Sequence, residues 1–207
     1  MQTTLKRWPW AWEQGQSPKL APPALATRLR MELELLLKKE NWVKALHNLQ
    51  SWNALLLLDK GLQEDQKWNR RLRSAAKLNI EPLTALVAGA SDSKALGERL
   101  QLPIHQQNLL RQSNELEKLI FLINSSNVHL DWMPSDWCNA IEEMNLHPDA
   151  VAITICRGNP LWKPLLRWFA NWRKIKSPIS AKELMKQGWA SGPELGKEMQ
   201  RQRYKLL

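Results

Sequence analysis

The sequence is poor in the residues that build β-sheets, disulfide frameworks and metal clusters. Valine, isoleucine and threonine together number 18 against 36 leucines, although β-branched side chains are the ones that strands favour. The two cysteines, Cys138 and Cys156, form no Cys-x-x-Cys pair. A structural zinc site needs about four ligands at characteristic spacing. These shortages predict an all-α protein, an irregular multi-helix bundle without bound metal, in a reducing cytoplasm.

Long apolar runs are also missing. No segment approaches the ~20 apolar residues of a membrane span, and the first residues lack the apolar run and cleavage site of a signal peptide. We therefore expect a cytoplasmic protein without a membrane partner. Tyrosine and phenylalanine are scarce, but 12 tryptophans are spread along the chain. Their even spread favours helix packing over a single binding platform.

Acidic residues are scarce in the final quarter of the chain. Residues 157–207 carry 12 Lys and Arg against 3 Glu, whereas residues 1–156 carry 18 basic and 17 acidic side chains. Nearly all of the net charge of +10 therefore lies at the carboxyl end. This asymmetry indicates an acidic polymer as partner, of which nucleic acid is the commonest. An anionic membrane surface is the competing explanation.

Leucine spacing, capping residues and prolines predict helices along most of the chain. Residues 1–21 have no period and contain three Trp, so they are expected to form an aperiodic strap. Residues 124–133 are predicted to be a loop that separates a helical unit at 22–124 from a second unit at 125–207. The expected helices cover residues 22–40, 42–50, 68–78, 82–90, 92–100, 105–124, 135–144 and 148–155, with further helices from 160, 181 and 193. A buried helical turn is expected at 55–58, closed by Gly61.

The last two predicted helices have clear local signals. Ser180 and Glu183 make a capping box, and Gly188 suits the left-handed residue that ends a helix. Gly192 or Ser191 caps the next helix, with Pro193 at its first position.

This basic end is the best candidate site, and it predicts RNA contacts through phosphate. Lys182 and Lys186 lie four positions apart, as do Lys197 and Arg201, so each pair shares a helix face. Backbone N–H groups after Gly192 could cap a phosphate. The predicted RNA-binding residues are Arg167, Arg173, Lys174, Lys182, Lys186, Gly192, Lys197, Arg201 and Arg203.

Purely structural interpretations of these and neighbouring residues are also open. Gly192 could simply turn the chain, and Gly196 could simply let helices approach closely. Trp168 and Trp172 could stack a base, but core packing is favoured. A cluster at Arg70, Arg71 and Arg73 is a weaker second patch, for which a solvated helix face is the favoured interpretation.

No catalytic constellation is found. The four histidines lie in separate segments without metal-ligand spacing, and there is no nucleophile elbow or phosphate-binding loop. We predict no catalytic residue, no metal ligand and no cofactor in this chain.

Three pieces, in order, resemble the carboxyl part of the class II CCA-adding enzymes, the family of tRNA nucleotidyltransferase and bacterial poly(A) polymerase. The first piece comprises residues 26–37, with Arg28-x-x-x-Glu32-Leu33, which resemble the family's neck helix, together with residues 45–59, which resemble the helix and turn after it. Residues 96–103 are similar to the body segment. Residues 180–197, with Gly192-Pro193 before a helix, resemble the tail signature.

The resemblance implies an elongated neck, body and tail of helices that hold the tRNA elbow, while a catalytic head adds nucleotides to the 3′ end. The Asp-x-Asp pair of that head, its Mg²⁺ and its CTP or ATP have no counterpart here. Glu32 and Glu34 are the closest match to that Asp-x-Asp pair. On a helix, however, side chains two positions apart point about 200° away from each other, so these two could not bind one metal ion. The head is expected upstream or on another polypeptide, with Trp8, Trp10 and Trp12 in a remnant of the head–neck junction.

The predicted function is therefore tRNA gripping for 3′-end (CCA) addition or repair, with no nucleotidyl transfer by this chain alone. The alternative is a stand-alone all-α module that binds ribosomal RNA, DNA or an acidic protein. Autonomous nucleotide transfer is disfavoured because metal-binding carboxylates are missing.

Overall fold

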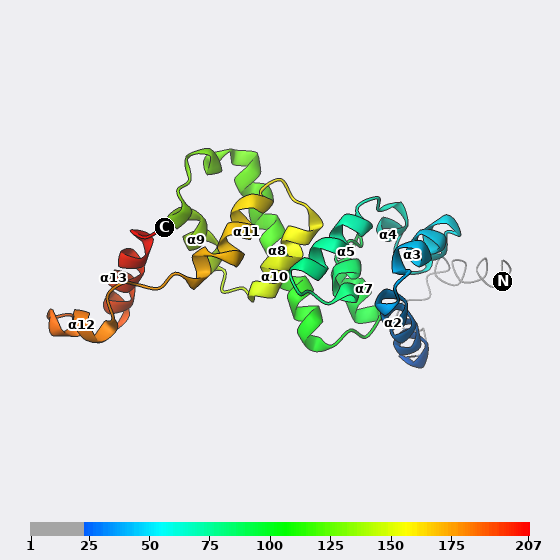
Figure 1. Ribbon diagram of the computed structural model, residues 1–207, viewed down its shortest axis with the longest axis horizontal. Helices are drawn as coiled ribbons and strands as arrows, with labels where there is room; N and C mark the ends of the chain where they lie inside the picture. The colour runs from blue at the N-terminus through cyan, green and yellow to red at the C-terminus, as the bar shows by residue number, and fades with distance from the viewer. Residues whose placement is uncertain (1–22) are drawn as a thin grey trace.

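The computed structural model describes residues 23–207, and the expected strap at 1–21 lies outside them. The described chain is built from helices and contains no strand, so the all-α prediction is confirmed (Figure 1). The α-helices are α2 (Pro23–Lys38), α3 (Trp42–Ser51), α4 (Lys60–Glu64), α5 (Trp68–Lys77), α6 (Pro82–Val87), α7 (Ser93–Arg99), α8 (Ile104–Ser126), α9 (Pro134–Glu143), α10 (Pro148–Arg157), α11 (Trp162–Ala170), α12 (Ala181–Lys186) and α13 (Pro193–Tyr204). Short 3₁₀ turns are η2 (Ala54–Leu57), η3 (Val128–Asp131) and η4 (Trp172–Lys174). No helix within residues 23–207 has the length and apolarity to cross a bilayer.

Local chemistry sets most helix starts. The Asp92 carboxylate accepts a hydrogen bond from the Ala95 N–H at 2.9 Å, which caps α7. Proline occupies the first position of α6, α9, α10 and α13, where its missing N–H costs nothing. Asn53, Asn79, Asn127 and Asn145 have positive φ at helix ends, a conformation that asparagine tolerates.

Several predicted boundaries were wrong, including the end of α6, which lies at Val87 rather than Ala90. α9 begins at Pro134 rather than Ser135, and the Met133 N–H before it donates to the Asp136 carboxylate at 2.7 Å. α11 begins at Trp162 rather than Pro160. α8 continues to Ser126, and η3 occupies part of the expected loop. Gly61 lies inside α4, which Asp59 caps, so it does not close the preceding turn.

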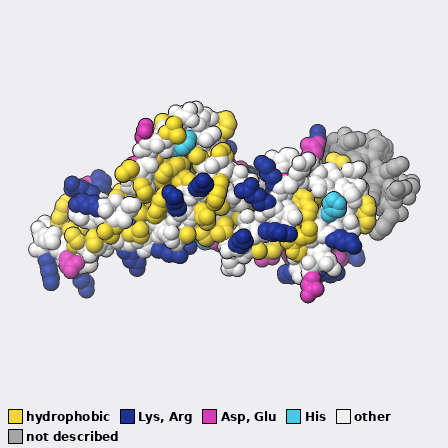
Figure 2. Space-filling model, turned by 45° about the horizontal axis from the view of Figure 1, so that its top comes forward, with side chains coloured by type: hydrophobic (Ala, Val, Ile, Leu, Met, Phe, Trp, Pro, Cys, Tyr) yellow, Lys and Arg dark blue, Asp and Glu magenta, His cyan; other side chains and the backbone are white. Residues whose placement is uncertain are grey.

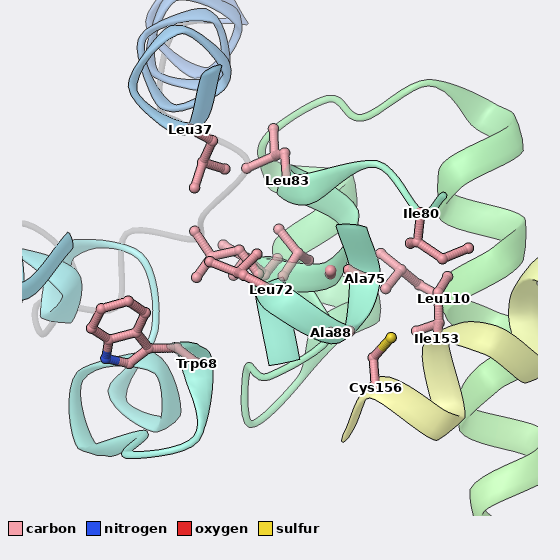
Figure 3. Close-up of a cluster of buried hydrophobic side chains, with 14 of the residues drawn as sticks. Leu37, Trp68, Leu72, Ala75, Ile80, Leu83, Ala88, Leu110, Ile153 and Cys156 are labelled. Carbon is pink, nitrogen blue, oxygen red and sulfur yellow. The ribbon is translucent and has the colours of Figure 1, made fainter. Parts of the chain in front are cut away.

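The larger hydrophobic cluster joins the first half of the chain. Leucines from α2 to α8 meet there, and side chains from α10 complete it (Figure 3). Leu37, Leu83, Leu110 and Ile153 are among its buried members. Each fully buried side chain of this size stabilises the fold by about 1.5–3 kcal/mol through loss of apolar contact with water.

The second cluster lies around the carboxyl half of α8. It brings together Leu116, Ile120, Trp137, Ile141 and Leu165, all buried. α8 therefore contributes to both clusters, and the domain boundary expected at residue 124 stays a prediction. Seven consecutive residues of α10, Ala150 to Cys156, are buried, because α10 is packed between the two clusters.

Arg71 lies inside the first cluster rather than on a solvated face. Its exposed fraction is 3%. It forms an ion pair with Asp65, and its Nε donates to the Ala85 carbonyl at 2.7 Å. Both interpretations of Arg71, as part of a solvated helix face and as part of a basic patch with Arg70 and Arg73, were wrong, because the Asp65 carboxylate and the Ala85 carbonyl draw its guanidinium inward.

The molecule is elongated, with α2 and α12 near opposite ends of its long axis (Figure 1). At the α12 end the chain leaves α11 through η4 and crosses an extended segment before α12 and α13. We call residues 173–207, from Arg173 to the carboxyl end, the basic arm.

Candidate nucleic-acid interface

The basic arm is a small helical hairpin with little core of its own. Leu184 of α12 and Leu195 of α13 are its buried apolar residues. The Ser180–Glu183 capping box is confirmed. The Ser180 N–H donates to the Glu183 carboxylate at 2.8 Å, and the Glu183 N–H donates to Ser180 Oγ at 3.3 Å. The hydrogen bonds from Ser180 lower the pKa of Glu183.

Lys and Arg side chains gather at the arm, seen at the left of Figure 2. The arm carries nine Lys and Arg against three Glu, and each of those Glu already has a partner. Glu183 is in the capping box, Glu194 pairs with Lys197 at 2.8 Å, and Glu198 pairs with Arg201 at 3.5 Å. Apart from Arg203, whose contacts are described below, the remaining cations of the arm form no ion pair within residues 23–207.

The exposed lysines without a carboxylate partner in the described chain form one group along the arm. They are Lys174, Lys176, Lys182, Lys186 and Lys205. Three of them, Lys174, Lys182 and Lys186, belong to the predicted site. Lys176 and Lys205 are additions that sequence reasoning missed, although the charge count of the final quarter already included them.

Predicted residues on α11 and η4 are exposed and continue this surface toward the body. Arg167 lies on α11 with its side chain exposed. Arg173 donates through Nε to the Phe169 carbonyl at 2.6 Å, with its guanidinium 4.7 Å from the centre of the Phe169 ring. This places Arg173 firmly while its other N–H groups remain available.

Arg203 differs from the other predicted residues because it faces the body. Its two Nη atoms donate to the Glu142 carboxylate at 2.6 and 2.8 Å, and Nη2 also donates to the Trp172 carbonyl at 2.9 Å. Its side chain is 15% exposed. In this geometry Arg203 fastens α13 to α9 and η4, and a bidentate pair of this kind fixes orientation as well as distance.

Glu142 is the partner that holds this joint. It also accepts a hydrogen bond from Trp168 Nε1 at 3.0 Å. Burial alone would raise the pKa of Glu142, but the hydrogen bonds from Arg203 and Trp168 and the charge of Arg203 outweigh it, so the pKa lies below its ordinary value. Trp168 is buried and Trp172 packs against the second cluster, in line with the favoured core interpretation.

The glycines of the tail have distinct roles. Gly188 has φ +97°, which confirms it as the left-handed end of α12. Gly192 has φ +156° and ψ −170°, a region essentially restricted to glycine. A Cβ on Gly196 would meet nothing within 4 Å, so the idea that Gly196 permits close helix approach was wrong. Gly192 thus turns the chain, and its predicted phosphate contact remains a prediction.

A groove elsewhere on the described chain is less suited to a polyanion. It has a volume of about 740 Å³ between α7, α8 and α10, and Arg157 lies in its wall. Arg157 already pairs with Glu117 and donates to Ser93 Oγ at 3.0 Å and Asn114 Oδ1 at 2.8 Å. Its charge is therefore neutralised inside the protein.

One exposed surface is apolar instead of basic. Large apolar side chains that are 48–74% exposed cluster where α8 ends and η3 leads into α9. We call this surface the apolar tip, and it consists of Phe121, Leu122, Val128, Leu130 and Met133. Contiguous exposed apolar side chains are typical of protein-interaction surfaces.

No group of three or more His, Cys, Asp or Glu within residues 23–207 could hold a metal ion. His105 and His147 do come together, with ring centres 5.4 Å apart, which their separation in sequence did not predict.

Comparison of the chain with protein-family models, curated proteins and solved structures finds no match. The likeness to class II CCA-adding enzymes therefore rests on the sequence motifs described above.

Proposed function

We propose that the protein binds structured RNA by gripping its phosphate backbone with the basic arm. The observation that carries this proposal is the group of five exposed lysines on the projecting basic arm, none paired with a carboxylate within residues 23–207. Such a surface favours phosphate and gains entropy from released counterions. Contacts of this kind read backbone shape rather than base sequence.

The RNA to test first is tRNA. The three motifs that resemble the neck, body and tail of class II CCA-adding enzymes favour it, as does the elongated helical body that ends in a basic hairpin. On this proposal the chain grips tRNA for 3′-end addition or repair. Nucleotidyl transfer, with its Mg²⁺ and CTP or ATP, belongs to a catalytic head outside this chain.

The test is the salt dependence of tRNA affinity. The logarithm of the association constant should fall linearly with the logarithm of salt concentration, with a slope of about −0.7 to −0.9 per phosphate contacted. Five lysine contacts then give a slope of about −3.5 to −4.5. An affinity that does not respond to salt would overturn the proposal.

A double variant locates the contact. Lys182→Gln with Lys186→Gln should weaken tRNA binding and make the slope shallower by about 1.5, since two phosphate contacts are lost. The matched control is Lys44→Gln with Lys77→Gln, which removes the same charge from exposed lysines on α3 and α5. Equal effects of the two pairs would show that net charge, not the arm, governs binding.

The apolar tip favours a second candidate, a module that binds another protein. Competition experiments separate the two functions. Displacement of tRNA by other tRNA but not by duplex DNA of equal charge supports the first. The second function is supported if the protein binds no RNA but associates with another protein, and if Leu130→Asp abolishes that association.

A further inference from the structure

Trp189 lies within a run of exposed residues, 185–194, on the basic arm. It follows Gly188 in the turn between α12 and α13, and its exposed fraction is 38%. Trp68, Trp137 and Trp168 are at most 7% exposed. The indole N–H groups of Trp68 and Trp168 donate to Gln50 and Glu142. Trp189 makes no such side-chain hydrogen bond within residues 23–207.

The backbone beneath Trp189 is held firmly. The Trp189 N–H donates to the Leu184 carbonyl at 3.2 Å, and the Gly188 N–H donates to the Met185 carbonyl at 3.1 Å. This pair of bonds closes the carboxyl end of α12, while the Leu184 side chain is buried. The indole is therefore presented to solvent from an ordered turn.

Two lysines of α12 precede this ring closely in the sequence. Lys186 precedes Trp189 by three positions, and Lys182 lies one helical turn before Lys186. Both lysines are exposed, and neither pairs with a carboxylate in the described chain. An exposed aromatic face beside unpaired lysines is the combination that binds unpaired nucleotides, with bases stacked on the ring and phosphates held by the cations.

We propose that Trp189 stacks on an unpaired nucleobase while Lys182 and Lys186 hold the adjoining phosphates. The inference rests on the proposed RNA-binding function and narrows its ligand to RNA with an unpaired base, in a loop or at an end. Bases inside a duplex are already paired and stacked, so duplex RNA offers the arm its phosphates alone.

The test compares two labelled RNAs by fluorescence anisotropy, a single strand of about 12 nucleotides and a duplex of the same length. Trp189→Leu should weaken single-strand binding by about 5- to 100-fold, the range for losing one base–aromatic stack. Duplex affinity and both salt slopes should stay unchanged, because stacking releases no counterions. Trp189→Phe should keep most of the single-strand affinity.

Trp52→Leu is the matched control. Trp52 is 64% exposed but lies at the end of α3, in the half of the chain where charges balance. This variant should bind both RNAs like the unmodified protein.

Each remaining outcome is decisive. Unchanged single-strand binding by Trp189→Leu, or equal losses for single strand and duplex, overturns the stacking role and leaves the arm as a phosphate-binding surface. Binding of duplex alone by the unmodified protein does the same. No binding of either RNA overturns the proposed function together with the inference.

Discussion

At the scale of single residues, the strictest requirement concerns Gly89. A Cβ at this position would overlap the guanidinium of Arg71, which is buried against Asp65 and the Ala85 carbonyl. The sequence alone did not reveal the contact between Gly89 and Arg71, because Arg71 lies on α5 and Gly89 follows α6.

We expect Gly89→Ala to lower the free energy of unfolding by about 3 kcal/mol, since displacing Arg71 leaves a buried charge uncompensated. Urea denaturation measures the change. Gly196→Ala is the control, because its added Cβ meets open space within an exposed helix, and it should stabilise the protein by about 0.5–1 kcal/mol. Equal stability of the Gly89→Ala variant and the unmodified protein would contradict this account.

The two cysteines give a second residue-scale prediction. Burial raises the pKa of Cys138 to about 11 and that of Cys156 to about 12. Because the thiolate is the reactive form, iodoacetamide at mildly alkaline pH should leave both thiols unmodified in the folded protein and modify both in denaturant. Intact mass spectrometry distinguishes these states, and rapid labelling without denaturant would refute the prediction.

At the scale of elements, the contact between α13 and α9 depends on Arg203 and Glu142. The folded-state pKa of Glu142 is lowered, so this carboxylate stabilises the docked arm fully above its ordinary pKa of 4.5. That stabilisation is lost as pH falls through the lower folded value. The arm should therefore leave the body in acid.

Energy transfer between dyes at Gln66→Cys and Gln187→Cys can follow this release, because both native cysteines are buried and should not take up dye in the folded protein. We expect the transfer efficiency to change only below about pH 4.5. In Arg203→Met the arm should be released already at neutral pH, so its profile should be flat. The same acid transition in both proteins would show that another group controls docking.

Sequence predicted the elements of the arm better than their attachment. The Ser180 capping box, Gly188 and Pro193 act within a few residues, so local chemistry was sufficient. Arg203 and Glu142 are 61 positions apart, and no local pattern distinguishes an arginine that pairs across the fold from one that faces solvent. The same limit concealed the exposure of Trp189, because burial depends on distant helices.

At the scale of the whole molecule, the two hydrophobic clusters are joined by α8 and α10. Ile153 belongs to the first cluster, whereas Val151 and Ile155 of the same helix belong to the second. Neither cluster has a complete set of packing partners without α10. We therefore expect the body to unfold as one cooperative unit.

Ile153→Val tests this expectation. It should destabilise the body by about 0.5–1.5 kcal/mol, and hydrogen exchange through global unfolding should accelerate equally in peptides from α5 and α9. The arm, with its small core, should exchange faster than both and be unaffected. Faster exchange in α5 alone would mean that the clusters unfold separately.

The burial of α10 also determines when the protein can fold during synthesis. Leu110 and Ile153 lie close together in the first cluster (Figure 3), but the ribosome makes Leu110 well before α10. At about 5–20 residues per second, the helices of the amino-terminal half wait roughly 2–10 s for Ala150 to Cys156. During that interval their leucines remain open to chaperones, and a nascent chain halted before α10 would be a target for degradation.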